Sequence, residues 1–302
     1  MINQQEIAEE IKSLSSLRNI IETYQEIAAT RMQRVKDSVL RNRDFLADLH
    51  DIYSELRTSY VRELDRIIKR KNRSLLANST DFSLLTRNNK SVSVLLSSNT
   101  KLYGDIIKKT FNRFKEEINT NESDIVIVGK VGLQMFKEAA IDRPYTFFEL
   151  SDSILDDKAF NEVIEQIKPY EKITVYHGKF EDILSQIAST TEISTNLPTG
   201  EPSSKDNEET KPANVRRSYI FEPSLEEVLI FFETEILASI LEQTVNESNL
   251  SKFTSRMISL DSTVENINKN LKQANFTKQW LRHRELNRKQ LDSLSGLTLW
   301  NS

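Results

Sequence analysis

Apolar side chains recur near the start of the chain at alternating intervals of four and three residues. The stripe consists of Ile7, Ile11, Leu14, Ile21, Ala28, Met32, Val35 and Val39, and continues through Phe45, Leu46, Leu49, Ile52, Leu56, Tyr60, Leu64 and Ile67. Such intervals keep one face of an α-helix turned towards one partner helix. Because neither glycine nor proline occurs between Gln4 and Arg73, the pattern predicts one rod of about 100 Å.

A second stripe with the same intervals lies near the end of the chain. It follows Pro223 in a segment without glycine, and it consists of Phe253, Met257, Leu260, Val264, Ile267, Leu271, Ala274 and Leu281. Either helix alone would leave its stripe in water, whereas an antiparallel coiled coil hides both. We therefore expect Ile21 and Ala28 to face Met257 and Val264 across a seam.

Between the two stripes the chain changes to short apolar runs rich in Val, Ile and aromatic residues. Runs at residues 91–96, 124–129, 145–150 and 172–176 are typical of buried strands, and helical stretches at 102–118, 131–139 and 158–167 alternate with them. This alternation predicts a Rossmann-like, mostly parallel sheet. Segments 185–194 and 217–221 are candidate edge strands, and the polar composition of residues 196–214 predicts a disordered loop.

The predicted fold class is therefore α/β with long helices, an antiparallel N-/C-terminal coiled coil plus a central α/β domain. We expect a long N-terminal helix in residues 1–75, the central domain in 76–221 and a long C-terminal helix in 222–302. Composition favours an elongated molecule, because 28% of the residues are charged while only 6 Gly and 6 Pro are present.

Charge and residue usage exclude several classes of function. A net charge of -4 gives no general attraction for nucleic acid. The chain contains no cysteine, and its three histidines are too far apart in sequence for a metal-ligand spacing, so no metal or cofactor is expected. No apolar run approaches the roughly 20 residues needed to span a bilayer, and the start of the chain lacks the pattern of a secretory signal. We expect a protein kept inside the cell that meets the membrane only through partners.

Two features of the predicted sheet could carry chemistry. Gly129 lies in a strand-to-helix turn, but the sequence around it has neither of the glycine spacings that cradle phosphate, so a tight turn is the favoured interpretation. Acidic residues gather where the third strand ends, at Glu149, Asp152, Asp156 and Asp157. They could form a site at the carboxyl edge of the sheet, but solvated acids that cap a helix are the favoured interpretation.

Residues 278–289 near the end of the chain are basic and include Trp280. A basic helix with an aromatic residue could bind RNA. It also suits the C-terminus of a helix or a sleeve of acidic protein around the helix, and we favour the sleeve.

Several segments resemble the gamma subunits of F-type ATP synthases. Residues 11–14 (IKSL) and 28–34 (AATRMQR) are similar to the family's opening, 221–229 (FEPSLEEVL) to its "YEPSPEEVL", 255–260 (SRMISL) to its "ARM.AM", and 291–296 (LDSLSG) to its "EL.EIV.G". The segments cover both ends of the chain in the family's order. In the middle, Ser98, Leu102 and Gly104 match the family's "SDRGLCGG", while Asp105 replaces its second glycine.

The resemblance implies a central-stalk rotor shaft that couples ion flow through a membrane ring to ATP synthesis or hydrolysis in a catalytic ring. Such a chain is not an enzyme by itself and holds no cofactor. The implied partners are the alpha and beta subunits of the catalytic ring, the epsilon subunit and the proteolipid c-ring, with the complex at the cytoplasmic face of the cell membrane and carrying out hydrogen ion transport. Expected contacts with the catalytic ring are Lys12, Tyr24, Arg31, Arg256 and Arg282, and Leu102 and Gly104 mark a loop of the central domain.

Other functions remain open at this point. The chain could be a coiled-coil scaffold, a gamma-like subunit of a specialised rotary ATPase not dedicated to ATP synthesis, or a nucleotide-dependent enzyme built on the central sheet. Co-purification with ATPase catalytic subunits would distinguish a shaft from a scaffold, and direct nucleotide binding would favour the enzyme.

Overall fold

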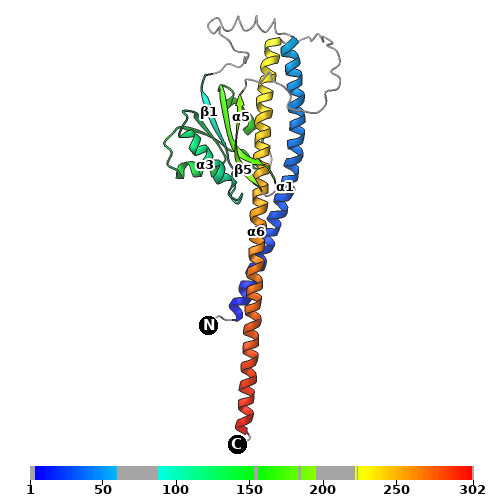
Figure 1. Ribbon diagram of the computed structural model, residues 1–302, viewed down its shortest axis with the longest axis vertical. Coiled ribbons are helices and arrows are strands. Elements are labelled where there is room, and N and C mark those ends of the chain that lie inside the picture. Colours follow the sequence, from blue (N-terminus) through cyan, green and yellow to red (C-terminus); the bar gives the residue numbers. More distant parts are fainter. Residues whose placement is uncertain are drawn as a thin grey trace.

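Two long helices form the axis of the molecule, and an α/β domain is attached to one side of their upper half (Figure 1). The computed structural model describes residues 4–59, 88–152, 156–182, 185–194, 222 and 224–300. Helix α1 covers Gln4–Ser59, and helix α6 covers Leu225–Trp300. They run antiparallel, and α6 extends past the start of α1, so that its C-terminal end stands alone (Figure 1). At its 76 residues, α6 is a rod of about 110 Å.

The apolar faces of the two helices pack against each other. One cluster joins Ile11, Leu14 and Ile21 of α1 to Leu260, Val264, Ile267 and Leu271 of α6. At the same level Gln25 donates a hydrogen bond to Asp261 Oδ1 at 3.2 Å. The antiparallel coiled coil predicted from the two stripes is therefore present.

The second half of α1 corrects part of the predicted stripe. Phe45 and Ile52 are 50% and 47% exposed, because the seven-residue register continues unchanged and leaves both side chains off the seam. Asn42 and Tyr53 occupy seam positions in their place and are buried. Asn42 donates to Ser239 O at 3.2 Å, and the Tyr53 hydroxyl donates to a carboxylate oxygen of Glu233 at 3.0 Å. Polar residues at these positions satisfy their hydrogen bonds across the two helices.

The central sheet has the strand order β3-β2-β1-β4-β5. Its strands are β1 (Ser91–Leu96), β2 (Asp124–Val128), β3 (Tyr145–Phe148), β4 (Lys172–Phe180) and β5 (Gln186–Ser194). The first four pair in parallel, and β5 lies antiparallel to β4 at one edge. The mostly parallel sheet expected from the sequence is confirmed, with the segment at 185–194 as an edge strand.

Helices cover both faces of the sheet. Helix α3 (Ile106–Ile118) and helix α4 (Lys130–Glu138) pack on one face, where Phe114 and Phe136 are buried. Helix α5 (Asp157–Ile167) covers the other face together with α6, which contributes Leu237, Leu241 and Val245. Helix α6 therefore has two packing roles. It is one of the two helices of the coiled coil, and it covers one face of the sheet.

Helix α3 begins at Ile106, four residues later than expected. Leu102 and Gly104 have positive φ angles of 74° and 63°, which a right-handed helix cannot include. The expected continuation of the first helix to residue 75, the loop at 196–214 and the strand at 217–221 lie outside the described residues.

Candidate functional site

The loop after β1, residues 97–104, lies where the α/β domain meets α6. Arg256 of α6 donates from Nη2 to Lys101 O at 2.8 Å and from Nε to Leu102 O at 3.1 Å. Its guanidinium carbon lies 3.9 Å from the centre of the Tyr103 ring. One arginine thus binds two backbone carbonyls of the loop and the face of an aromatic ring.

This contact continues through the molecule to α1. The Tyr103 ring meets the Phe253 ring edge to face, with 6.0 Å between centroids. On the far side, the guanidinium of Arg31 lies 5.9 Å from the centre of the Phe253 ring. The structure therefore connects two of the five expected contact residues, Arg31 and Arg256, through the Phe253 and Tyr103 rings.

The tip of the loop combines close packing with exposure. A Cβ atom added to Gly104 would lie 2.5 Å from Ser255 Oγ, so the backbone approaches α6 more closely than any other residue would allow. Two residues earlier, Leu102 has a positive φ, which strains its backbone, and its side chain is 69% exposed. An exposed apolar side chain on a strained backbone is costly, and such strain often marks a functional contact.

A buried carboxylate holds the same loop from the other side. Asp152 follows β3, and its oxygens accept hydrogen bonds from the backbone N–H of Asn99 at 3.0 and 3.1 Å and from that of Thr100 at 3.1 Å. The Thr100 hydroxyl donates to the same carboxylate at 3.2 Å. The Asn99 side chain also donates to Leu150 O at 2.6 Å. Consecutive N–H groups that converge on one anion form a backbone nest, here filled by the chain itself.

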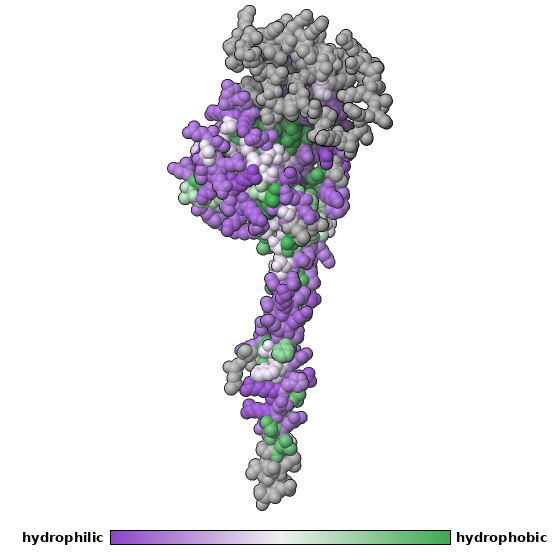
Figure 2. Space-filling view, viewed as in Figure 1, coloured by the Kyte–Doolittle hydropathy of each residue, from purple (hydrophilic) through white to green (hydrophobic). Residues whose placement is uncertain are grey.

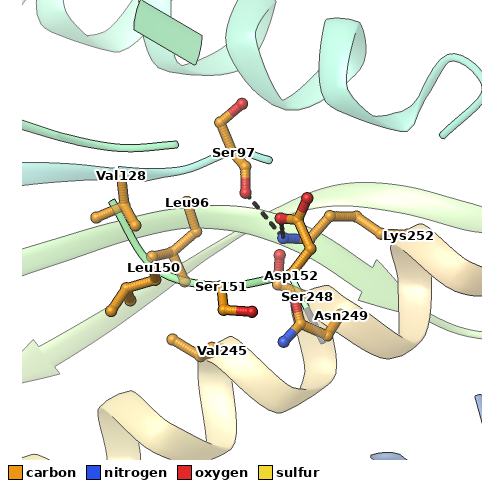
Figure 3. A pocket seen from close by; sticks show the side chains of 10 residues that line it. All are labelled: Leu96, Ser97, Val128, Leu150, Ser151, Asp152, Val245, Ser248, Asn249 and Lys252. Carbon is orange, nitrogen blue, oxygen red and sulfur yellow. Dashed lines mark hydrogen bonds and ion pairs between the residues drawn. The ribbon is translucent and has the colours of Figure 1, made fainter. Parts of the chain in front are cut away.

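Lys252 of α6 completes the cluster (Figure 3). Its side chain is only 6% exposed, its Nζ donates to Ser97 O at 2.8 Å, and it lies 4.0 Å from Asp152 Oδ1. Burial lowers the pKa of Lys252 to about 8, although the Asp152 carboxylate opposes that shift. The ammonium group therefore remains mostly charged at neutral pH.

The carboxyl edge of a parallel sheet is where α/β folds commonly bind nucleotides, and this cluster lies there. The cavity beside Lys252 has a volume of about 10 Å³, room for one water molecule, whereas small-molecule sites occupy about 300 Å³ or more. Gly129, with a φ of 101°, makes the tight turn into α4, and an added Cβ would lie 2.8 Å from Ser98 N. The space next to these N–H groups is occupied by protein atoms, which disfavours a nucleotide site.

The four acidic residues after β3 have different roles. Asp156 caps α5 by accepting from Lys158 N at 3.2 Å, and Asp157 lies in the first turn of that helix, as the capping interpretation expects. Glu149 forms an exposed ion pair with Lys130 at 2.6 Å. For Asp152 the interpretation as a solvated acid is wrong, because its side chain is 9% exposed and binds the loop. Its place after a strand was the only signal in the sequence.

The remaining expected residues lie along the coiled coil, away from the loop. Lys12, Tyr24 and Arg282 are exposed, Ile21 and Ala28 are buried against α6, and Met257 and Val264 are half-buried. Sequence reasoning missed Lys252, which is next to the seam residue Phe253. Within the described residues, no group of His, Asp or Glu side chains could hold a metal ion.

A family model described as ATP synthase matches residues 3–288. The ATP synthase gamma chain of Cytophaga hutchinsonii is 21% identical over 311 aligned positions that cover 100% of both chains. That of Chloroherpeton thalassium is 23% identical and covers 98% of this chain and 97% of its own length.

The fold is also found among solved structures. A chain from the central stalk and c-ring of the Tetrahymena thermophila mitochondrial ATP synthase superposes with a TM-score of 0.56 at 16% identity, over 81% of this chain and 99% of that one. Sequence matches over nearly the whole chain and this shared fold agree. The chain therefore belongs to the ATP synthase gamma family and is a non-catalytic subunit of the central stalk of an F-type ATP synthase.

Proposed function

We propose that the lower half of the coiled coil turns inside a ring of alpha and beta subunits, whose nucleotide affinities it sets by presenting a different face to each. The observation that carries this proposal is the exposed apolar surface on the part of the coiled coil that lies below the α/β domain. Among the described residues, α1 and α6 alone extend below the α/β domain, and Figure 2 shows a narrow, largely hydrophilic rod with separate apolar patches. Large apolar side chains on so thin a rod favour a protein partner.

One apolar patch lies on α1 beside the seam, about a quarter turn around the helix from it. Leu17, Ile20, Tyr24 and Ile27 follow intervals of three, four and three residues and are between 42% and 53% exposed. These intervals place the four side chains on one face of the helix. Tyr24, expected from the family resemblance to touch the catalytic ring, is part of this face, and the charged residue Lys12 lies exposed nearer the start of the helix.

A second patch lies near the free end of α6. Phe276 is 71% exposed and Trp280 is 52% exposed. Residues 278–289 contain five basic side chains and one acidic one. Arg282 lies in this segment, and Arg284 stacks at 5.4 Å from the centre of the Trp280 ring. A helix segment with exposed aromatic and basic side chains is complementary to a surrounding protein surface with apolar and acidic groups. We expect the ring of catalytic subunits to provide that surface.

The opposite end of the shaft carries the α/β domain, which we propose rests on the epsilon subunit and the c-ring. No helix in the described part of the chain has an apolar stretch long enough to cross a bilayer. Attachment at the cytoplasmic face of the cell membrane would then come through the c-ring.

In this mechanism the chain performs no chemistry. Each catalytic subunit exists in states of different nucleotide affinity, and the shaft stabilises the state that fits the face it presents. Rotation changes which face each subunit meets. The coupling requires a rod that is stiff along its length and different around its circumference, and the patches on α1 and α6 provide that difference.

A paired substitution at the tip tests the contact with the ring. Phe276→Ser with Trp280→Ser removes apolar area that is mostly in water, so the unfolding temperature of the isolated chain should change little. Assembly with alpha and beta subunits should weaken at least about tenfold, since two buried aromatic side chains are worth several kcal/mol at an interface. Lys272→Ser, an exposed change on the same helix, is the control.

Undiminished assembly and ATP-driven rotation in the paired variant would contradict the proposed contact. Failure of the unmodified chain to co-purify with any ATPase catalytic subunit would contradict the rotor function altogether and would favour a scaffold.

A further inference from the structure

We propose that Asp152 and Lys252 form a buried charged clamp that fixes the α/β domain to α6, so that domain and shaft turn as one rigid body. The turning rests on the proposed rotor function. The clamp itself is a property of the isolated chain and can be tested there.

Three distant segments of the chain meet at the clamp. The loop after β1 supplies the backbone N–H groups of Asn99 and Thr100 and the carbonyl of Ser97. The segment after β3 supplies Asp152, and α6 supplies Lys252. A single carboxylate therefore ties two loops of the α/β domain together, and a single ammonium group ties that assembly to the shaft.

The groups in the clamp depend on one another. A carboxylate so little exposed would be strongly destabilised without its donors and a nearby positive charge, and the ammonium group needs the carboxylate and the carbonyl for the same reason. Hydrogen bonds to charged groups are stronger than those between neutral groups. Separation of the domain from α6 would break the bond from Lys252 to Ser97 O and the ion pair with Asp152 together, so the joint resists opening more than apolar packing alone.

The clamp lies at a place where packing is otherwise weak. Ser97 Oγ and Ser248 Oγ are buried without a hydrogen-bond partner, and both line the small cavity beside Lys252 (Figure 3). The remaining lining is mixed. The α/β domain contributes apolar side chains and Ser151, and α6 contributes Val245 and Asn249. Small polar side chains give this stretch of α6 little apolar area to bury, and the charged bonds supply the missing attachment.

Hydrogen exchange on the full chain tests the clamp. Asp152→Ala should speed exchange at the amides of Asn99 and Thr100 by about 10- to 100-fold, because each loses a bond to a charged acceptor. Exchange in the α1–α6 seam around Ile21 and Ile267 should stay unchanged. Sodium formate supplies a free carboxylate and should restore slow exchange in a saturable way, while sodium chloride at the same ionic strength should restore less.

Two further variants make the test specific. Asp152→Asn fills the same space with a neutral amide, so its exchange at residues 99 and 100 should be fast and should not respond to formate. Glu192→Ala removes an exposed acid that pairs with Lys172 on the far edge of the sheet, and it should leave the loop unchanged. Unchanged exchange in both Asp152 variants, or an equal response of both to formate, would overturn the clamp. Should Asp152→Ala fail to fold, the Asn variant alone decides by the same criterion.

The assembled complex separates this proposal from the rotor function. With the clamp weakened, Asp152→Asn should hydrolyse ATP at a near-normal rate while pumping fewer ions per ATP, because the shaft turns without carrying its domain firmly. Fast exchange at the loop with no assembly of either the variant or the unmodified chain would leave the clamp standing and would contradict the rotor function instead. Fast exchange with fully normal pumping in the variant would show that the clamp does not transmit rotation.

Discussion

The guanidinium carbon of Arg256 lies 3.9 Å from the centre of the Tyr103 ring, so a helix of the shaft and a loop of the α/β domain share a cation–π contact. The same side chain donates to two carbonyls of that loop. Family resemblance assigns Arg256 to the catalytic ring, yet within this chain its Nε and Nη2 already donate hydrogen bonds to the loop. The two roles make different predictions for the isolated protein.

Arg256→Lys should destabilise the isolated chain by about 1–2 kcal/mol. Lysine keeps the charge but lacks the planar fork that reaches both carbonyls while stacking on Tyr103. Urea unfolding at neutral pH measures the change. Arg282→Lys, an exposed position on the same helix, is the control and should change the free energy of unfolding by less than about 0.5 kcal/mol. An unchanged stability in Arg256→Lys together with lost ATPase activation in the complex would assign Arg256 to the ring.

Ile21→Asp should uncouple the lower coiled coil, while Ile20→Asp should be tolerated. Ile21 is buried in the cluster with Ile267 and Leu271, whereas its neighbour Ile20 is 53% exposed. A carboxylate in the seam leaves an unpaired buried charge and costs about 3–5 kcal/mol, against less than about 1 kcal/mol at the exposed position. Thermal unfolding of the two variants, followed by circular dichroism, gives the comparison. Equal losses would mean that the seam is not specific at this level.

Sequence reasoning predicted the long helices because their signal is repetitive. A seven-residue spacing of apolar residues over many turns predicts a helix that pairs with another helix. Short runs rich in Val and Ile predict the buried strands of a parallel sheet. It failed locally where side-chain type and register disagreed, as at Phe45 and Ile52, which are apolar but lie off the seam. Packing geometry decided those positions, not the hydrophobicity of the single residue.

The cluster around Asp152 could not be predicted for a different reason. Asp152 and Lys252 are far apart in sequence, and each resembles an ordinary surface charge among others. Only the fold shows that α6 packs against two surfaces, the sheet and α1. Lys252 lies one position off the seam with α1 and is therefore buried against the α/β domain. A helix that packs on two surfaces has no simple polar face, and the hydrophobic pattern of that stretch is accordingly weak.

Substitutions at two left-handed backbone positions should act in opposite directions. Gly129→Ala places a Cβ within 3 Å of the Ser98 backbone at a φ of 101° and should cost about 2–3 kcal/mol. Ala140, exposed and with a φ of 49°, is strained, so Ala140→Gly should be neutral or stabilise by up to about 1 kcal/mol. Chemical denaturation of both variants measures the free energies. Destabilisation by Ala140→Gly equal to that by Gly129→Ala would show that backbone conformation is not the cause.

His177 should make the stability of the α/β domain depend on pH between about 6.5 and 4. On β4, its Nδ1–H donates to Gly178 O at 3.2 Å, and its Nε2 accepts from the Thr191 hydroxyl at 2.8 Å. One donating and one accepting nitrogen correspond to the neutral imidazole. Burial lowers the pKa of His177 to about 4, with a smaller contribution from the positive charges of Lys179 and Arg113. The unfolded chain, with an ordinary pKa near 6.5, binds a proton first as the pH falls. The stabilisation is therefore complete above pH 6.5 and is lost as the pH falls towards 4, with about 2 kcal/mol gone between pH 8 and pH 5. His177→Gln removes this group while the carboxylates are unchanged, so the difference in unfolding free energy between the two proteins isolates the histidine. Parallel curves for the two proteins from pH 8 to pH 5 would refute the lowered pKa.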